Sequence, residues 1–230
     1  MSTLKTIEPF GEGFISALCP ELILFAGLIL LIIVPNLGTG KFRIPGTQTR
    51  VYWLFGGNRF KLTSDPRLPS WIAVITLGTA FLMSILSFQD GVERTAIVSE
   101  GGTEILMVNA FSRVFELVFF GALTLAAFAS MNRMDVKGIG AKLSSEDLYN
   151  NRRQGDFYIL MITCAIGMSI VALAQDLFVL FIGLELASFS TYVLVSFFKE
   201  TKAGTEAGMK YFIVGSVASG VGLYGLSMLY

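Results

Sequence analysis

The most informative ionisable residue of this 230-residue chain is Glu185. It lies inside the apolar segment 177–198, in the order Leu180-Phe181-Ile182-Gly183-Leu184-Glu185-Leu186-Ala187-Ser188. A carboxylate within hydrocarbon is costly unless it is paired or hydrated, so such residues mark functional sites by default. Ser188 follows at i+3 and lies on the same helical face. We therefore expect Glu185 to take up and release protons. The alternative, a hydrogen bond that only fixes helix packing, stays open.

Lys210 is the second candidate for proton transfer, because it lies inside the last apolar segment, residues 205–230. Glu206 stands four residues earlier, so an ordinary ion pair between neighbouring helical turns explains the lysine equally well. The lysine side chain could also reach out to the membrane interface. Along the membrane normal we expect Lys210 to lie more than about 10 Å from Glu185, so exchange between them would need water molecules.

Two other carboxylates lie near the ends of apolar segments. Glu116 is a further candidate for the proton path, together with Glu206 and Ser188. Arg113 stands one turn before Glu116, and an interfacial ion pair is the favoured reading of these two residues. Glu21 follows Pro20 in the first turn of the first apolar segment, where it stabilises the positive end of the helix dipole.

Several kinds of chemistry are excluded by residue types that the chain lacks. There are no histidines, which removes histidine metal sites and histidine general bases. The two cysteines, Cys19 and Cys164, both lie in or beside apolar segments and are expected to be buried thiols. No glycine-rich loop joins a strand to a helix, and no cysteine cluster could hold iron–sulfur. We expect no metal, no bound cofactor and no redox centre in this chain.

The composition is that of a membrane protein. Hydrophobic residues make up 53% and charged residues 15%, and the mean hydropathy is +0.68. About 20 apolar residues are needed to cross a bilayer as a helix. Six segments are predicted to do so, which gives an all-α fold, a polytopic transmembrane helix bundle. They are Leu18–Val34, Trp71–Phe88, Phe111–Ser130, Phe157–Ala174, Leu177–Phe198 and Thr205–Tyr230.

The connections between these segments predict an orientation and one unusual loop. Lysine and arginine are concentrated in the first, third and fifth connections, so these are expected on the cytoplasmic side. Residues 36–70 form a long basic extramembrane loop, either a hairpin on the membrane surface, a contact for a neighbouring subunit or a solvated loop. Apart from this loop, residues 1–230 are expected to form a single transmembrane domain.

The last third of the chain resembles a known family. The phrases that carry the resemblance are Gly183-Leu184-Glu185-Leu186, Glu206-Ala207-Gly208-Met209-Lys210-Tyr211-Phe212 and the segment 220–230. Cys19-Pro20-Glu21 is similar to the family's opening. The family is subunit N of complex I, which is called subunit 2 in mitochondria and has a counterpart in plastids. Members normally continue through further spans, so the chain is expected to be the N-terminal part of a longer antiporter-like subunit.

The resemblance implies a function and partners. It implies a membrane subunit of an NADH–quinone-type oxidoreductase that moves protons while other subunits pass electrons to a quinone. The positions of Glu185 and Lys210 match residues of the family's proton path. Quinone, flavin and iron–sulfur clusters are then expected in partner subunits, and NADH, ferredoxin or a deazaflavin as donor. A prokaryotic plasma membrane is the expected location, with plastid or mitochondrial membranes as alternatives.

Two other functions remain open from the sequence. One is a cation/proton antiporter subunit without redox partners, built on the same helices. The other is a membrane scaffold in which the buried carboxylates serve packing only. The phrase from Glu206 to Phe212 favours the oxidoreductase subunit over both.

Overall fold

The helices lie where hydropathy places them. A computed structural model describes residues 17–33, 40–43, 50–53, 67–89, 94–98, 104–131, 145–197 and 201–229. Within these residues the chain forms the helices α2 (Cys19–Ile33), α3 (Leu68–Gln89), α4 (Ala110–Ser130), α5 (Ser145–Leu173), α6 (Leu177–Val195) and α7 (Lys202–Leu229). Each coincides with one predicted span, so the polytopic helix bundle is confirmed.

One helix is shorter than a membrane span requires, and another begins well before its predicted span. Five of the described helices are long and apolar enough to cross a membrane, but α2 has 15 residues and is a shorter apolar helix. At 1.5 Å per residue, 15 residues extend over roughly 22 Å, less than the hydrocarbon thickness of about 30 Å. Helix α5 begins at Ser145 rather than Phe157. Hydropathy detects only the part of a helix that lies in hydrocarbon, so the polar turns before residue 153 escaped it.

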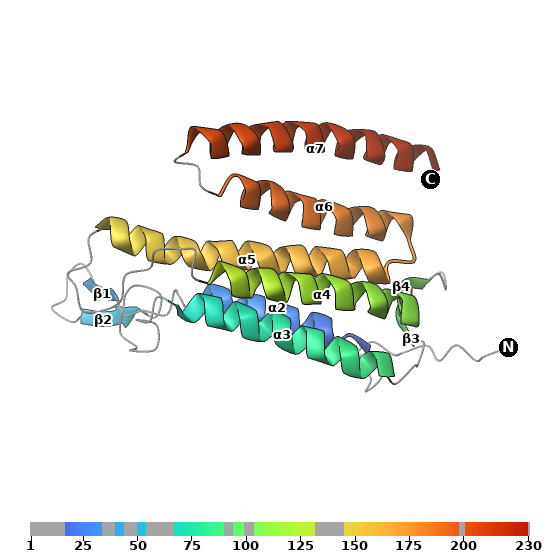
Figure 1. Ribbon diagram of the computed structural model, residues 1–230, viewed down its shortest axis with the longest axis horizontal. Coiled ribbons are helices and arrows are strands. Elements are labelled where there is room, and N and C mark those ends of the chain that lie inside the picture. The colour runs from blue at the N-terminus through green and yellow to red at the C-terminus, as the bar shows by residue number, and fades with distance from the viewer. Residues whose placement is uncertain are drawn as a thin grey trace.

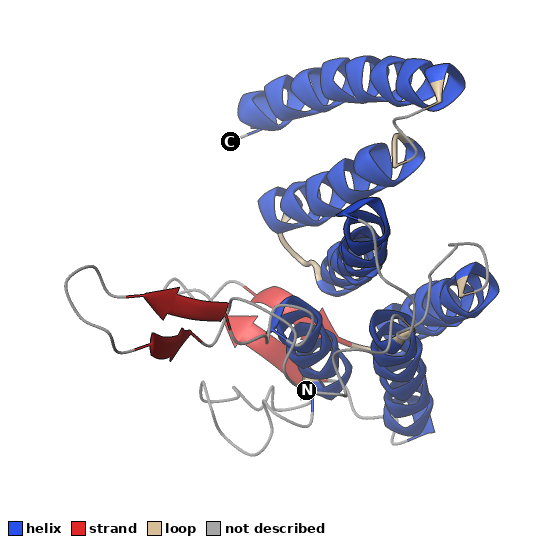
Figure 2. Cartoon of the chain, turned by 90° about the vertical axis from the view of Figure 1, so that its left-hand side faces the viewer, coloured by secondary structure: helices blue, strands red, loops and turns tan. Residues whose placement is uncertain are grey.

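Successive helices run in opposite directions (Figure 1). Helices α2, α3, α4 and α5 pack on one another, α6 packs on α5, and α7 packs mainly on α6. Figures 1 and 2 both show α6 lying between α5 and α7. The buried core therefore lies among α2 to α5, with Leu24, Leu77, Phe120, Tyr158 and Ile162 fully buried in it. Helix α7 is the peripheral one, and Gly208 is its one buried residue among those described.

The turn between α5 and α6 is tight. Ala174, Gln175 and Asp176 separate the helices, and the Asp176 side chain accepts hydrogen bonds from the backbone N–H groups of Phe178 and Val179. This side chain caps α6 by satisfying two of its free N–H groups. Away from the turn, α5 and α6 also approach each other closely at Gly167. A Cβ at this position would lie 2.5 Å from the backbone nitrogen of Ala187.

Two short antiparallel hairpins lie at opposite ends of the bundle (Figure 1). Strands β1 (Gly40–Arg43) and β2 (Arg50–Trp53) pair within the predicted basic loop, whose remaining residues up to 66 lie outside the described part of the chain. Strands β3 (Arg94–Val98) and β4 (Glu104–Val108) form the second hairpin, which the sequence analysis did not predict. Strands of five residues with irregular register carry too little alternation to be recognised.

The β3–β4 hairpin is attached to the turn between α5 and α6. The Gln175 N–H donates a 3.0 Å hydrogen bond to the Ile105 carbonyl, and Leu106 forms a bridge with Ala174. Val108 is buried with Ala17, Leu18 and Leu173. The hairpin thus covers the end of the bundle at which α2 and α4 begin and α5 ends.

Candidate functional site

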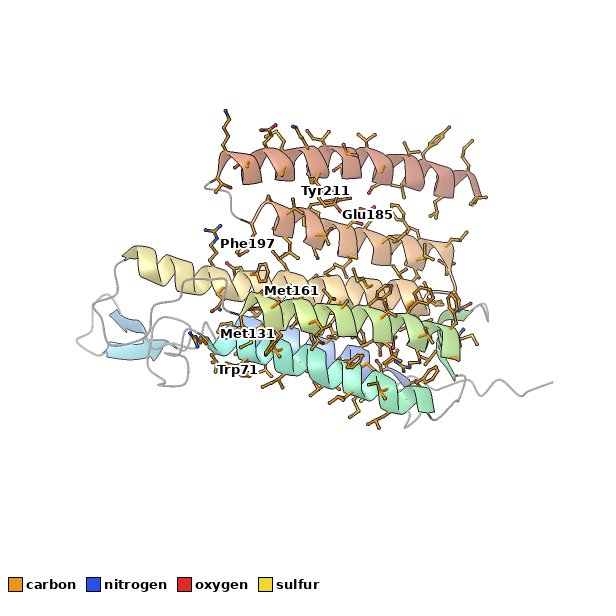
Figure 3. The ribbon with its side chains drawn as sticks, viewed as in Figure 1. Trp71, Met131, Met161, Glu185, Phe197 and Tyr211 are labelled. Carbon is orange, nitrogen blue, oxygen red and sulfur yellow. The ribbon has the colours of Figure 1, made fainter. Side chains whose placement is uncertain are left out.

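Glu185 lies on the face of α6 that packs against α7. Three close contacts define this face, since Ser196, Tyr192 and Phe181 approach Gly208, Gly215 and Gly222 of α7. Phe181, Glu185, Ser188, Tyr192 and Ser196 follow one another at spacings of three or four residues, so they share one side of the helix. Figure 3 shows Glu185 on the side of α6 that faces α7. Both Glu185 and Ser188 are half-buried.

The opposite face of α6 packs against α5. Gly183 and Ala187 belong to this face, because a Cβ at Gly183 would lie 3.0 Å from the backbone nitrogen of Val171, and Ala187 contacts Gly167. Two residues correspond to about 200° around a helix, which turns Glu185 away from α5. The small residues on either side of Glu185 therefore let α6 approach α5 while the carboxylate is directed to α7.

Aromatic side chains fill the rest of the α6–α7 contact. The ring centroid of Tyr192 lies 5.0 Å from that of Tyr211 and 6.1 Å from that of Phe212, both edge-on. The Tyr192 hydroxyl lies against Gly215, where a Cβ would come within 2.1 Å of it. Tyr192 follows Glu185 by two turns on the same face, so a phenol hydroxyl lies between α6 and α7 on the cytoplasmic side of Glu185 in the expected orientation.

Lys210 and Glu206 form an ion pair on α7. The Lys210 Nζ lies 2.5 Å from Glu206 Oε1, and 73% and 56% of the two side chains are exposed. Lys210 follows Gly208, which faces α6, by two residues and therefore lies on the opposite side of α7. Its level corresponds to the end of α6, roughly ten residues and about 15 Å from Glu185. The structure keeps Glu185 and Lys210 apart. The sequence analysis expected this separation.

Glu116 belongs to a buried charged cluster at the end of the bundle covered by the β3–β4 hairpin. Its Oε2 lies 2.5 Å from Nη1 of Arg113, and the same Nη1 lies 3.7 Å from Oε1 of Glu21. Nη2 of Arg113 donates to the Ala17 carbonyl. Glu116, Arg113 and Glu21 are 0%, 2% and 8% exposed. The predicted ion pair exists, and it is buried within the bundle.

Two hydroxyl groups from the other helices complete this cluster. Ser169 of α5 donates a 2.9 Å hydrogen bond to Glu21, and Ser84 of α3 donates a long one of 3.5 Å to Glu116. The start of α4 is fixed by Asn109, whose side chain accepts from the Ser112 N–H while the Ser112 hydroxyl accepts from the Asn109 N–H. This capping box positions Arg113 and Glu116 one and two turns inside α4.

Sequence reasoning missed Glu21, Ser169 and Ser84 as members of one site. It assigned Glu21 to the helix dipole alone, because no partner was visible within its own segment. One signal was present. Helices α2 and α4 run in the same direction, so the third residue of one and the fourth residue of the other lie at the same depth. The serines carried no such signal.

Helices of this number, length and hydropathy define a multi-pass membrane protein. The sequence model of the family described as NADH:quinone oxidoreductase/Mrp antiporter, TM, matches residues 174–230, which contain Glu185 and Lys210. Taken with the relatives below, this match identifies the chain as a member of the subunit N family of NADH-quinone oxidoreductases.

Three relatives illustrate the likeness. NADH-quinone oxidoreductase subunit N of Methylobacterium nodulans is 35% identical over 175 residues, which cover 72% of this chain and 36% of that protein. F(420)H(2) dehydrogenase subunit N of Methanosarcina mazei is 31% identical over 217 residues, 93% of this chain and 36% of that protein. NADH-quinone oxidoreductase subunit N 1 of Roseiflexus castenholzii is 36% identical over 133 residues, 56% of this chain and 22% of that protein. The chain spans about a third of the length of the first two of these relatives.

Proposed function

We propose that this chain is a proton-translocating membrane subunit of a complex I-type oxidoreductase, with Glu185 as a proton carrier. The observation that carries the proposal is the position of Glu185, a carboxylate inside an apolar helix that is directed to the neighbouring helix α7 rather than to lipid. Ionisable residues in membrane helices face protein or water-filled cavities when they move protons. The family match covers this helix and α7.

The route from Glu185 runs along the α6–α7 contact to the level of Lys210 and from there passes around α7, because Lys210 lies on the side of α7 that faces away from α6. Ser188 and Tyr192 lie on the same face of α6 as Glu185. Both lie between Glu185 and the end of α6, which is at the same level as Lys210. Hydroxyl groups and water molecules between them supply the hydrogen-bonded chain that a proton needs over about 15 Å. Redox events in other subunits would change the electric field at Glu185 and bias the direction of transfer. Glu206 holds Lys210 in place through the ion pair.

The remaining parts of the proposal concern the whole assembly. We propose that the described helices form one transmembrane domain with a basic extramembrane loop at 36–70. Partner subunits would hold the flavin, the iron–sulfur clusters and the quinone site, and would pass electrons from a reduced donor. The names of the relatives point to NADH or to F(420)H(2) as that donor. A prokaryotic plasma membrane is the proposed location.

A cation/proton antiporter is the second candidate function. It is favoured by one observation, since the matched family is described by both the quinone oxidoreductase and the Mrp antiporter. Purification of the native assembly through a tag on this chain separates the two. Copurifying redox subunits with donor-dependent quinone reduction and proton uptake support the oxidoreductase. Exchange of cations for protons with no redox partner would establish the antiporter instead.

The assignment of Glu185 is tested in the same preparation. A Glu185→Gln substitution keeps the size of the side chain but removes its charge. We expect assembly and quinone reduction to persist and coupled proton transport to fall. The control is Asp156→Asn, which removes a carboxylate from an exposed position on α5. Unchanged pumping by the assembled Glu185→Gln complex would refute the role of Glu185.

A further inference from the structure

The cluster of Glu21, Arg113 and Glu116 contains more negative than positive charge. Two carboxylates and one guanidinium leave one uncompensated negative charge if all three are ionised. None of the three residues is more than 8% exposed. An uncompensated charge buried in a low-dielectric interior is strongly unfavourable, and such groups are usually neutralised by a proton or a counter-ion.

The side chains that the structure describes around the cluster supply no second positive charge. Ser84 of α3 and Ser169 of α5 contribute neutral hydroxyls, and the chain before α2 contributes the Ala17 carbonyl. The end of the bundle next to the cluster is closed by Ala17, Leu18, Val108 and Leu173, which are apolar and buried. Among the side chains that the structure describes, Arg113 is therefore the single cation facing Glu21 and Glu116.

Each carboxylate also has one oxygen without a partner. Oε1 of the wholly buried Glu116 and Oε2 of Glu21 accept no hydrogen bond, and Nε of Arg113 donates none. Buried oxygens of this kind are normally satisfied, so an unsatisfied pair indicates a ligand that binds to them. A metal cation needs several oxygen ligands and would lie beside the guanidinium, which repels it. A proton needs one oxygen and adds no bulk.

We propose that the Glu21–Arg113–Glu116 cluster binds one exchangeable proton, held by the carboxyl pair of Glu21 and Glu116. The proton forms an O–H bond with one carboxylate oxygen. The cluster then contains one carboxyl group, one carboxylate and one guanidinium, and its net charge is zero. Release of the proton to water or to a neighbouring acceptor restores the net charge of minus one. The site is built from α2, α3, α4 and α5 and shares no residue with the Glu185 face of α6.

This inference goes beyond the proposed function and does not depend on it. The charge balance holds whether the assembly is an oxidoreductase, an antiporter or a scaffold, because it concerns the folded helices alone. In a proton-moving protein the cluster is a second proton-binding site, separated from Glu185 by α5. Loss of pumping in Glu185→Gln therefore says nothing about the cluster, and the reverse also holds.

Infrared difference spectroscopy of the protein purified with its native partner subunits tests the proposal. A protonated carboxyl group gives a C=O stretching band that shifts in heavy water. We expect this band to be weaker in Glu116→Gln than in the wild type, and weaker by an equal amount in Glu21→Gln. The carboxylate left in either variant pairs with Arg113 and stays ionised. The exposed-site control Asp156→Asn is expected to keep the band.

Three outcomes would overturn the proposal. A band unchanged in both variants means that neither carboxyl is protonated. The double variant Glu21→Gln/Glu116→Gln removes both carboxyls, and a band loss twice that of either single variant means two protons instead of one. If the band is absent and the melting temperature of the protein rises with sodium concentration, the cluster binds a metal cation.

Thermal unfolding gives an independent test of the charge balance. Each single variant keeps a neutral cluster and is expected to melt near the wild type. The double variant leaves Arg113 alone and is expected to melt below the wild type by far more than the sum of the single effects. Replacing Arg113 by Gln in addition removes the lone charge and is expected to recover most of the loss. Additive effects of the two substitutions would contradict the shared proton.

Discussion

Ser169 of α5 donates a 2.9 Å hydrogen bond to Glu21 of α2, although 148 residues separate them in the chain. Ser169 is fully buried, and Glu21 is 8% exposed. The contact joins the last part of α5 to the first turn of α2, where Glu21 also lies 3.7 Å from Nη1 of Arg113 of α4. This hydrogen bond therefore connects the charged cluster to α5, and another face of α5 packs against α6.

Removal of the Ser169 hydroxyl is expected to destabilise the bundle. A hydrogen bond to a charged group contributes about 1.5–3 kcal/mol, so Ser169→Ala should lower the free energy of unfolding by roughly that amount. The matched control is Ser227→Ala, because Ser227 is exposed on α7 and donates to the Tyr224 carbonyl of its own helix. Thermal unfolding of both variants in the same detergent measures the difference, and equal melting temperatures would contradict the prediction.

The cap of α4 is expected to matter for the same cluster. Asn109→Ala removes the side-chain acceptor of the capping box and should cost about 1 kcal/mol. Asn109→Ser keeps a capping oxygen and should restore most of the stability. Because the cap fixes the turn that carries Arg113, the alanine variant should also weaken the Arg113–Glu116 pair. A melting temperature that is the same in the alanine and serine variants would show that the cap is unimportant.

The helices of this fold could be predicted from the sequence, but one of its hairpins could not. Hydropathy predicted the helices because a span of about 20 apolar residues has few other solutions in lipid. The tight turn before Asp176 was visible as two polar residues between apolar segments. The β3–β4 hairpin was not visible, since its stability comes from contacts with the distant residues Leu173 and Gln175.

The two candidate sites differ in how much the sequence shows. Glu185 is conspicuous because it interrupts an apolar segment in the middle of a span. Glu21 and Arg113 lie near the ends of their segments, where charges are ordinary, and only helix packing shows that both are buried. Charge near the end of a span is therefore weak evidence of solvent exposure when a hairpin covers that end of the bundle.

The close contact between α5 and α6 gives a prediction with a matched control. A Cβ at Gly167 would lie 2.5 Å from the Ala187 backbone nitrogen, which cannot move without moving α6. Gly167→Ala should therefore destabilise the bundle by about 1–3 kcal/mol through overpacking. Gly220 on α7 has open space around it, so Gly220→Ala should be neutral or gain up to roughly 1 kcal/mol of helix propensity. Chemical denaturation of both variants checks the contrast, and a neutral Gly167→Ala would refute the close packing.

The Lys210–Glu206 pair separates stability from transport. The pair is largely exposed, so breaking it should change stability by less than about 1 kcal/mol. Lys210→Gln and Glu206→Gln should therefore unfold alike. In the assembled complex Lys210→Gln should reduce coupled proton transport strongly, whereas Glu206→Gln should reduce it only through the orientation of the lysine. Equal losses of transport in the two variants would mean that the pair itself, and not the lysine, is required.

Tyr192 provides the most specific test of the route between α6 and α7. Its ring packs edge-on against Tyr211 and Phe212, and its hydroxyl lies against Gly215, on the same α6 face as Glu185. Tyr192→Phe keeps the ring contacts and removes only the hydroxyl, so the melting temperature should stay near that of the wild type while coupled proton transport falls by less than in Glu185→Gln. Tyr211→Phe is the control, because it removes a hydroxyl from the partner ring on α7 and leaves the α6 face intact. If Tyr192→Phe pumps like the wild type while Glu185→Gln does not, the proton leaves Glu185 by a path that avoids the α6–α7 contact.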